Sequence, residues 1–170
     1  MAALNINIFT KHADRVKMAN IAQMVNVLQA MILTKDDKMV LTPTYHVFEM
    51  FKSYQDATAL TIDLTSPWYN KDASTVPAVS ASAVRDKDGR LHIGLVNVDP
   101  NQAITVTAKL AGVSASSVSG RILTAPAINS HNTFEQRTVV KPATFGGATI
   151  AGGGVKAVLP PKSVVVLDLQ

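Results

Sequence analysis

The side chains best suited to chemistry are polar groups that recur at every third position of one apolar stretch. They are Lys17, Asn20, Gln23, Asn26 and Gln29. A carboxamide offers both a donor and an acceptor, which suits it to the hydroxyl groups of a sugar. Burial of a carboxamide is costly unless it is hydrogen-bonded. One hypothesis is therefore that one or more of these amides bind a polar ligand. The alternative is an irregular core helix with amides at its edges.

The spacing of these side chains fits neither regular element over the whole stretch. A helix turns about 100° per residue, so a three-residue repeat drifts by about 60° at each step. A strand needs alternation or an unbroken apolar run, and residues 16–25 only approximate the second. A buried strand that runs into a functional loop would produce such a pattern.

Carboxylates that could act as acid and base are scarce in this chain. Its only glutamates are Glu49 and Glu135. Glu49 lies on the narrow polar face of a predicted helix, with Lys52 as its expected surface partner. Glu135 lies in a long predicted loop. Because carboxylates are rarely buried unless paired, we expect both to be solvated. The sequence therefore predicts no catalytic residue.

Metal, cofactor and nucleic-acid sites are not indicated. The 4 histidines, at positions 12, 46, 92 and 131, lack the spacing of zinc ligands. The absence of cysteine excludes disulfides and thiolate metal sites. The chain has no phosphate loop, serine elbow or dinucleotide fingerprint. Its net charge of +4 comes from dispersed basic residues that do not interleave with aromatics, which argues against nucleic acid.

The single tryptophan, Trp68, stands next to Tyr69 and follows Ser66-Pro67. Its ring could stack on a sugar. A hydrophobic plug between domains is an equally good interpretation, because the residue lies at the end of a predicted strand.

Two kinds of element should position these residues. Thr42-Pro43 supplies an N-cap and a first-turn proline for a helix whose broad apolar surface must be covered on more than one side. From Thr58 the period changes to two, as in a half-buried strand. Short strands bounded by turns then continue to the C-terminus and predict an antiparallel sandwich. The predicted strands cover residues 58–65, 76–85, 90–98, 103–110, 118–124, 155–159 and 163–169, with a turn at residues 86–89.

Four collinear segments of this chain resemble α-L-arabinofuranosidases of glycoside hydrolase family 51. They are residues 12–23, residues 42–51, residues 121–126 together with 129–135, and residues 159–166. The resemblance covers nearly the whole chain but corresponds only to the last third of such an enzyme.

The resemblance implies a mainly β protein with two parts. Residues 1–56 would be the C-terminal remnant of a catalytic (β/α)8 barrel, and residues 57–170 a jelly-roll-like antiparallel β-sandwich. It makes residues 2–12 the end of a barrel helix, although alternation over residues 4–9 alone favours a strand. It makes residues 16–25 the eighth barrel strand. Gln23 then lies near the carboxyl end of that strand, on the face where such barrels place their active sites.

The resemblance also implies retaining hydrolysis of terminal α-L-arabinofuranosyl groups from arabinan, arabinoxylan or their oligosaccharides, without a cofactor. Such enzymes need two carboxyl groups about 5 Å apart. The family's catalytic pair lies upstream of the matched segments, so the chain alone should be inactive. Gln23 matches a substrate-binding glutamine that contacts the arabinose; the alternative is an amide that ties the strand end to a loop. The full enzyme is expected to be a homo-oligomer.

A rival interpretation is a non-catalytic carbohydrate-binding or structural β-sandwich module. It accounts for residues 58–170 but not for the amide run or the helix at Pro43. No apolar run approaches the ~20 residues that a membrane span needs. Residues 1–4 lack the charged segment of a signal peptide, so we expect them to lie inside a longer protein. The compartment stays open.

Overall fold

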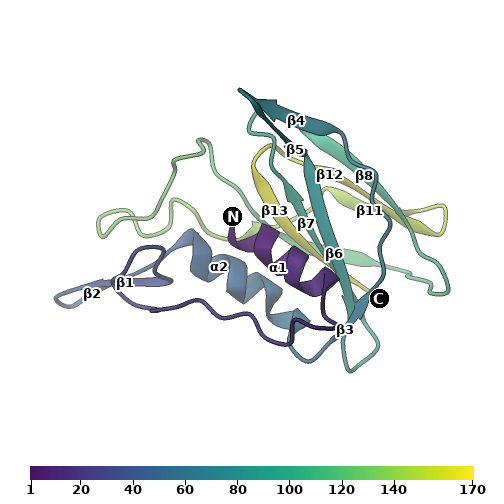
Figure 1. Ribbon diagram of the computed structural model, residues 1–170, viewed down its shortest axis with the longest axis horizontal. Helices are drawn as coiled ribbons and strands as arrows, with labels where there is room; N and C mark the ends of the chain where they lie inside the picture. Colours follow the sequence, from purple (N-terminus) through teal and green to yellow (C-terminus); the bar gives the residue numbers. More distant parts are fainter.

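The computed structural model describes residues 1–170 and consists mainly of antiparallel β-sheets (Figure 1). A six-stranded sheet has the order β10-β9-β13-β7-β6-β3, and a three-stranded sheet has the order β11-β12-β8. Every pairing in both sheets is antiparallel, which confirms the prediction of a mainly β protein with antiparallel sheets. The strands are β3 (Thr58–Leu60), β6 (Val79–Arg85), β7 (Leu91–Asn97), β8 (Ile104–Lys109), β9 (Val118–Leu123), β10 (Ala143–Thr144), β11 (Ala148–Ala151), β12 (Gly154–Leu159) and β13 (Ser163–Leu169).

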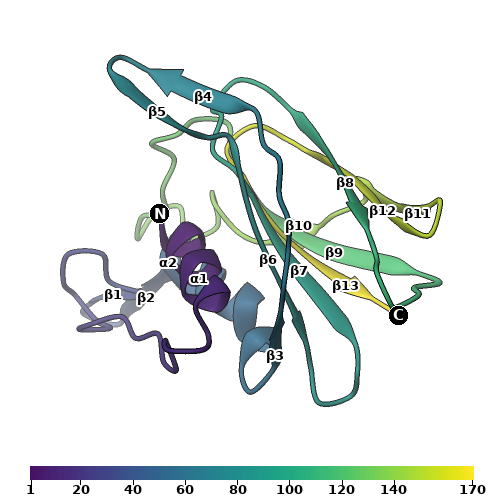
Figure 2. The ribbon, with the colours of Figure 1, turned by 45° about the vertical axis from the view of Figure 1, so that its right-hand side comes forward.

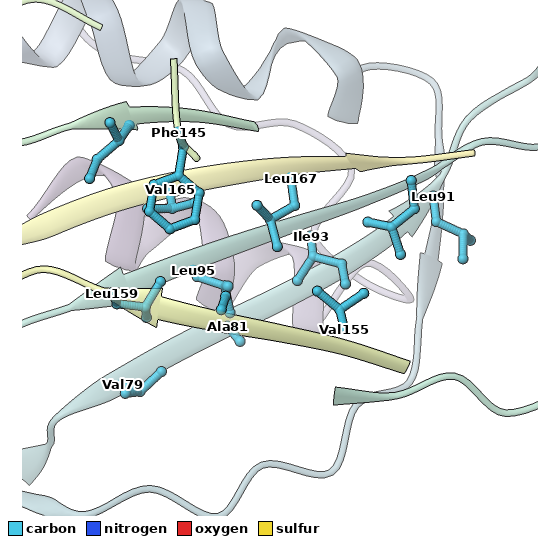
Figure 3. Packing of buried hydrophobic residues seen from close by; sticks show 13 residues of the cluster. Val79, Ala81, Leu91, Ile93, Leu95, Phe145, Val155, Leu159, Val165 and Leu167 are labelled. Carbon is cyan, nitrogen blue, oxygen red and sulfur yellow. The ribbon is translucent and has the colours of Figure 1, made fainter. Parts of the chain in front are cut away.

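The main core lies between the two sheets and follows from the two-residue period of their strands. Alternate residues of β7 and β13 point inward and meet the inward side chains of β12 (Figure 3). Leu159, Val165 and Leu167 are fully buried there. Burial of one such side chain contributes about 1.5–3 kcal/mol. These long central strands therefore hold the sandwich together.

The first predicted strand is shorter than expected, yet its burial pattern continues. Hydrogen-bonded pairing of β3 with β6 ends at Leu60. Ile62 and Leu64 nevertheless pack against the core, while Asp63 between them is exposed. The predicted strand over residues 76–85 is divided in two. Its first residues belong to a separate hairpin of β4 (Trp68–Lys71) and β5 (Ser74–Pro77) that was not predicted.

A helical layer covers the outer face of the six-stranded sheet (Figure 2). It consists of α1 (Ala2–Lys11), α2 (Pro43–Met50) and the 3₁₀ turn η1 (Phe51–Tyr54). The predicted cap of α2 is confirmed, because Thr42 Oγ1 accepts a hydrogen bond from Tyr45 N at 3.4 Å. A second apolar cluster joins the two layers. It contains Ala3, Val47, Met50, Phe51, Val96, Leu123, Val140 and Val166.

A buried polar network fixes the helices on the sheet. Asn7, in α1, is fully buried; its Oδ1 accepts from Ser82 Oγ at 2.6 Å. Tyr54 donates to the Ser82 carbonyl oxygen at 3.0 Å and accepts from Gly94 N at 2.6 Å. A Cβ on residue 94 would lie 2.6 Å from Phe51 Cε1, so the close approach of η1 to β7 requires glycine.

The eighth barrel strand predicted over residues 16–25 is wrong for this structure. Residues 16–24 form no regular element, and only a single parallel bridge joins Val25 to Ile32. A strand persists where neighbours pair its N–H and C=O groups, and no strand flanks residues 16–24 here. Beyond them, β1 (Ile32–Lys35) and β2 (Lys38–Leu41) form a hairpin around the predicted turn at residues 35–38.

Candidate functional site

Gln23 lies at the entrance of a loop that folds back on β1. The carbonyl oxygen of Met24, the next residue, accepts hydrogen bonds from Met31 N and Ile32 N, both at 3.0 Å. Asn26 closes the same loop with both ends of its side chain. Its Nδ2 donates to Thr34 Oγ1 at 2.8 Å, and its Oδ1 accepts from Thr34 N at 2.7 Å. The loop is thus held by residue 26 and by backbone, while Gln23 makes no side-chain hydrogen bond within the chain.

The three-residue period of the amides corresponds to a series of turns. Gln23, Asn26 and Gln29 have φ angles of 55°, 56° and 64°. A left-handed conformation costs roughly 1–2 kcal/mol for a residue with a Cβ. Such strained residues cluster at functional sites, where the surrounding structure holds them in place. This backbone explains why neither a helix nor a strand fitted the pattern.

The expectation that these amides are buried is wrong. All the polar side chains that interrupt the run are exposed, and the pattern therefore does not mark a core element. Large apolar neighbours of Gln23 are exposed as well. Leu28 is 95% exposed, and Met18 and Met24 lie on either side of the glutamine in sequence. A surface of this kind is typical of a site that another part of a protein covers.

The two glutamates lie in separate settings. Glu49 Oε1 accepts a hydrogen bond from Arg121 Nη1 at 2.6 Å, so its partner is Arg121 rather than Lys52. This bond lowers the pKa of Glu49 and raises the pKa of Arg121. Glu135 is exposed in the loop after β9, where its own backbone N–H and the Thr133 hydroxyl lower its pKa. Neither carboxylate faces another carboxylate as a glycosidase pair would.

Sequence reasoning missed a buried histidine held between two aspartates. His92 Nδ1 lies 2.6 Å from Asp168 Oδ1, and Nε2 lies 3.0 Å from Asp86 Oδ2. His92 and Asp168 are cross-strand partners in β7 and β13. The bond to His92 lowers the pKa of Asp86. With no nucleophile beside it, this trio ties the β6–β7 turn to the last strand.

Two hollows of the surface lie elsewhere. One of about 260 Å³ opens between the N-termini of α1 and α2 and is lined mostly by apolar side chains. Another of about 380 Å³ lies where Arg85 and Arg90 approach Gln170. Gln23 borders neither of them. No three His, Asp or Glu side chains gather in a way that could hold a metal ion. None of the helices has the length and apolar character needed to span a bilayer.

These elements define an antiparallel two-sheet sandwich with a helical layer on one face. Residues 1–163 match the family model of the "Alpha-L-arabinofuranosidase C-terminal domain". The chain belongs to this family, and it corresponds to the C-terminal portion of family 51 α-L-arabinofuranosidases.

Several relatives match nearly the whole chain. An intracellular exo-α-L-arabinofuranosidase of Bacteroides ovatus is 52% identical over 100% of this chain and 33% of its own length. An exo-α-(1→6)-L-arabinofuranosidase of Bifidobacterium longum is 31% identical over 94% of the chain. The crystal structure of the family 51 arabinofuranosidase of Xanthomonas axonopodis pv. citri superposes with a TM-score of 0.97 at 54% identity, covering 99% of this chain and 34% of that one. The chain thus spans about a third of these relatives.

Proposed function

We propose that this chain is the C-terminal part of a retaining α-L-arabinofuranosidase that releases terminal α-L-arabinofuranosyl groups from arabinan, arabinoxylan or their oligosaccharides. The observation that carries the proposal is the match of the whole chain, at 52% identity, to one third of an exo-α-L-arabinofuranosidase. The reaction would use a carboxylate pair about 5 Å apart, supplied by the remaining two thirds of the enzyme.

In this proposal, residues 1–56 contribute to the catalytic barrel and residues 57–170 form the jelly-roll-like sandwich. Support comes from residues 17–23, whose backbone makes no backbone hydrogen bond, and from the exposed apolar side chains around them. Barrel strands on either side would pair this backbone and would bring residues 16–25 into the predicted strand. The same contacts would bury Met18, Met24 and Leu28.

Gln23 is proposed to bind the arabinose. Its exposed carboxamide has no partner within the chain, whereas the neighbouring amide of Asn26 is used to close the loop. A free carboxamide can donate to one sugar hydroxyl and accept from another. The apolar neighbours would exclude water from those hydrogen bonds and so strengthen them.

The chain alone should not hydrolyse arabinosides, because its two glutamates do not form a carboxylate pair. Glu49, in α2, is paired with Arg121, and Glu135 lies apart from it in the loop after β9. The full enzyme is proposed to be a homo-oligomer that acts without nucleic acid, membrane or cofactor. Exposed apolar side chains outside the segment that the barrel would cover, such as Ile128 and Val139, would be available for such an assembly.

A chimera tests the proposal. This chain would replace the matching third of the Bacteroides ovatus relative, and hydrolysis of an aryl α-L-arabinofuranoside would be measured. We expect activity from the chimera and background turnover from the chain alone. A folded chimera without activity, or turnover by the chain alone, would contradict the proposal.

A further inference from the structure

The β4–β5 hairpin forms a two-stranded sheet of its own that projects from the sandwich (Figures 1 and 2). Its base is fixed by hydrogen bonds from Ala78 N to the Pro67 carbonyl oxygen at 2.8 Å and from Val79 N to Ser66 Oγ at 2.9 Å. In both views it lies at the top of the molecule, above the β1–β2 hairpin and separate from it. The hairpin is therefore a fixed projection with no role in either core.

One face of this hairpin carries an aromatic ring beside a carboxamide. Trp68 pairs with Pro77 and Asn70 pairs with Thr75 in the register. Alternate residues of a strand share a face, so these four side chains lie on the same side. Trp68 is 65% exposed although it is the largest apolar side chain of the molecule. The core gives no reason for this exposure.

The carboxamide beside the ring is held in one orientation. Thr75 Oγ1 donates to Asn70 Oδ1 at 2.8 Å. The oxygen end of the amide is thereby occupied, and the two N–H donors of Nδ2 have no partner in the chain. Residues two apart on a strand are separated by about 6.6 Å, roughly one sugar ring. A flat apolar surface with a donor at that distance matches the apolar face and a hydroxyl group of one monosaccharide.

We propose that this face of the β4–β5 hairpin is a binding site for a neutral carbohydrate chain, with Trp68 stacked on a sugar ring and Asn70 donating to a hydroxyl group. Arabinan- and xylan-derived chains are named as ligands, and that choice rests on the proposed function. The site belongs to the β4–β5 hairpin, whereas Gln23 belongs to the segment that precedes β1. The site would therefore act on retention of the polymer rather than on bond cleavage.

The charges of the hairpin favour a neutral ligand. Lys71 and Asp72 at its tip lie 3.6 Å apart and balance each other. A protein partner fits less well, because a stable interface buries about 800 Å² on each side. Only Trp68 and Pro77 are apolar on this face, and its other side chains are polar.

The only tryptophan of the chain makes the test specific, because its emission reports this site alone. The chain is titrated with arabino-, xylo- and malto-oligosaccharides while its fluorescence is recorded, and retardation is measured by affinity electrophoresis in arabinan and arabinoxylan. We expect a saturable change of tryptophan emission with the arabino- and xylo-oligosaccharides. We also expect that the Trp68→Ala variant is no longer retarded by arabinan or arabinoxylan. Asn70→Ala should weaken binding about 2- to 10-fold, as expected for one hydrogen bond.

Tyr69→Ala, on the opposite face of the same strand, is the matched control and should keep the retardation. No emission change with any sugar, or equal retardation of Trp68→Ala and the unchanged chain, would overturn the proposal. Self-association that Trp68→Ala abolishes in sedimentation, without sugar binding, would make the hairpin a contact between copies and would also overturn it. Binding of malto-oligosaccharides alone would support a carbohydrate site but contradict its assignment to arabinan and xylan. An inactive chimera would leave these binding results unaffected.

Discussion

Arg121 in β9 and Glu49 in α2 form a 2.6 Å ion pair that joins the helical layer to the six-stranded sheet. The pair spans the division at residue 56 that the sequence predicts between two domains. Its side chains are 45% and 38% exposed. An ion pair this accessible to solvent contributes less than about 1 kcal/mol. Substitution of either residue should therefore remove this link between the two parts while the chain stays folded.

Glu49→Gln should reduce the sensitivity of the chain to acid. Because Arg121 lowers the folded pKa of Glu49, the stabilisation is present above the ordinary carboxylate pKa of 4.5 and is lost as the pH falls through the lowered value. The variant should be less stable than the unchanged chain by under about 1 kcal/mol at pH 7 and equally stable near pH 2. Urea unfolding at both pH values measures this. An equal difference at both would show that the ion pair is not responsible.

Tyr54→Phe should destabilise the chain by about 1–3 kcal/mol at pH 7, because the buried Gly94 N–H loses its acceptor. Burial raises the pKa of Tyr54 well above the ordinary value of 10. The stabilisation tied to its proton is complete below pH 10 and declines as the pH rises further. The variant should therefore lose less stability than the unchanged chain between pH 9 and pH 11.

Tyr69→Phe is the control for that experiment, because Tyr69 lies on the β4–β5 hairpin outside the buried network. It should leave the unfolding midpoint at pH 7 unchanged. If Tyr54→Phe behaves in the same way, the phenol does not hold η1 against the sheet.

Gly94→Ala should cost about 1–3 kcal/mol through overpacking. The added Cβ would lie 2.6 Å from Phe51 Cε1 and 2.8 Å from the Tyr54 hydroxyl. Gly146→Ala is the matched control, since nothing lies within 4 Å of that position. Thermal unfolding of the two variants separates the effects. Phe51→Leu combined with Gly94→Ala should recover part of the loss, and a recovery of zero would argue against this contact as the cause.

Gln23→Ala in the chimera with the Bacteroides ovatus catalytic portion should lower kcat/KM by roughly tenfold to a hundredfold, the cost of a lost ligand hydrogen bond of about 1–3 kcal/mol. Gln29→Ala provides the control, because Gln29 has the same left-handed backbone in the same loop. Its kcat/KM should stay within a factor of about two. Equal losses in both variants would point to a deformed loop instead of a lost sugar contact.

Local sequence patterns predicted the strands of the sandwich well, because alternation of apolar and polar residues indicates which face of the sheet each side chain occupies. Ile62 and Leu64 keep their predicted burial even though hydrogen-bonded pairing stops at Leu60. The helix at Pro43 was equally clear, because its cap lies within a few residues of its start. The helix is determined by contacts between residues close in sequence, and the strands by a pattern that repeats along the chain.

Other features depend on groups that no local pattern contains. Residues 16–24 need neighbouring strands to form a strand, and the chain provides none for them. His92 finds its partners 6 and 76 residues away, so only the fold brings the trio together. The turn of the β4–β5 hairpin, at Asp72, lacks the Asn-Gly or Asp-Gly pair that usually identifies such turns. The unusual period indicated a group of amides and the family resemblance singled out Gln23 among them, but neither predicted that its side chain is exposed.

The buried amide of Asn7 has a practical consequence for dividing enzymes of this family. If the sandwich were cut out at residue 57, the side chains of Val96, Leu123 and Val166 would be exposed to solvent. The hydroxyl of Ser82 would lose Asn7 as its hydrogen-bond partner. The smallest soluble accessory unit would then be the sheets together with α1 and α2, linked by a redesigned bridge in place of residues 13–41. Domain swaps between relatives should accordingly transfer α1 and β13 together, as parts of one unit.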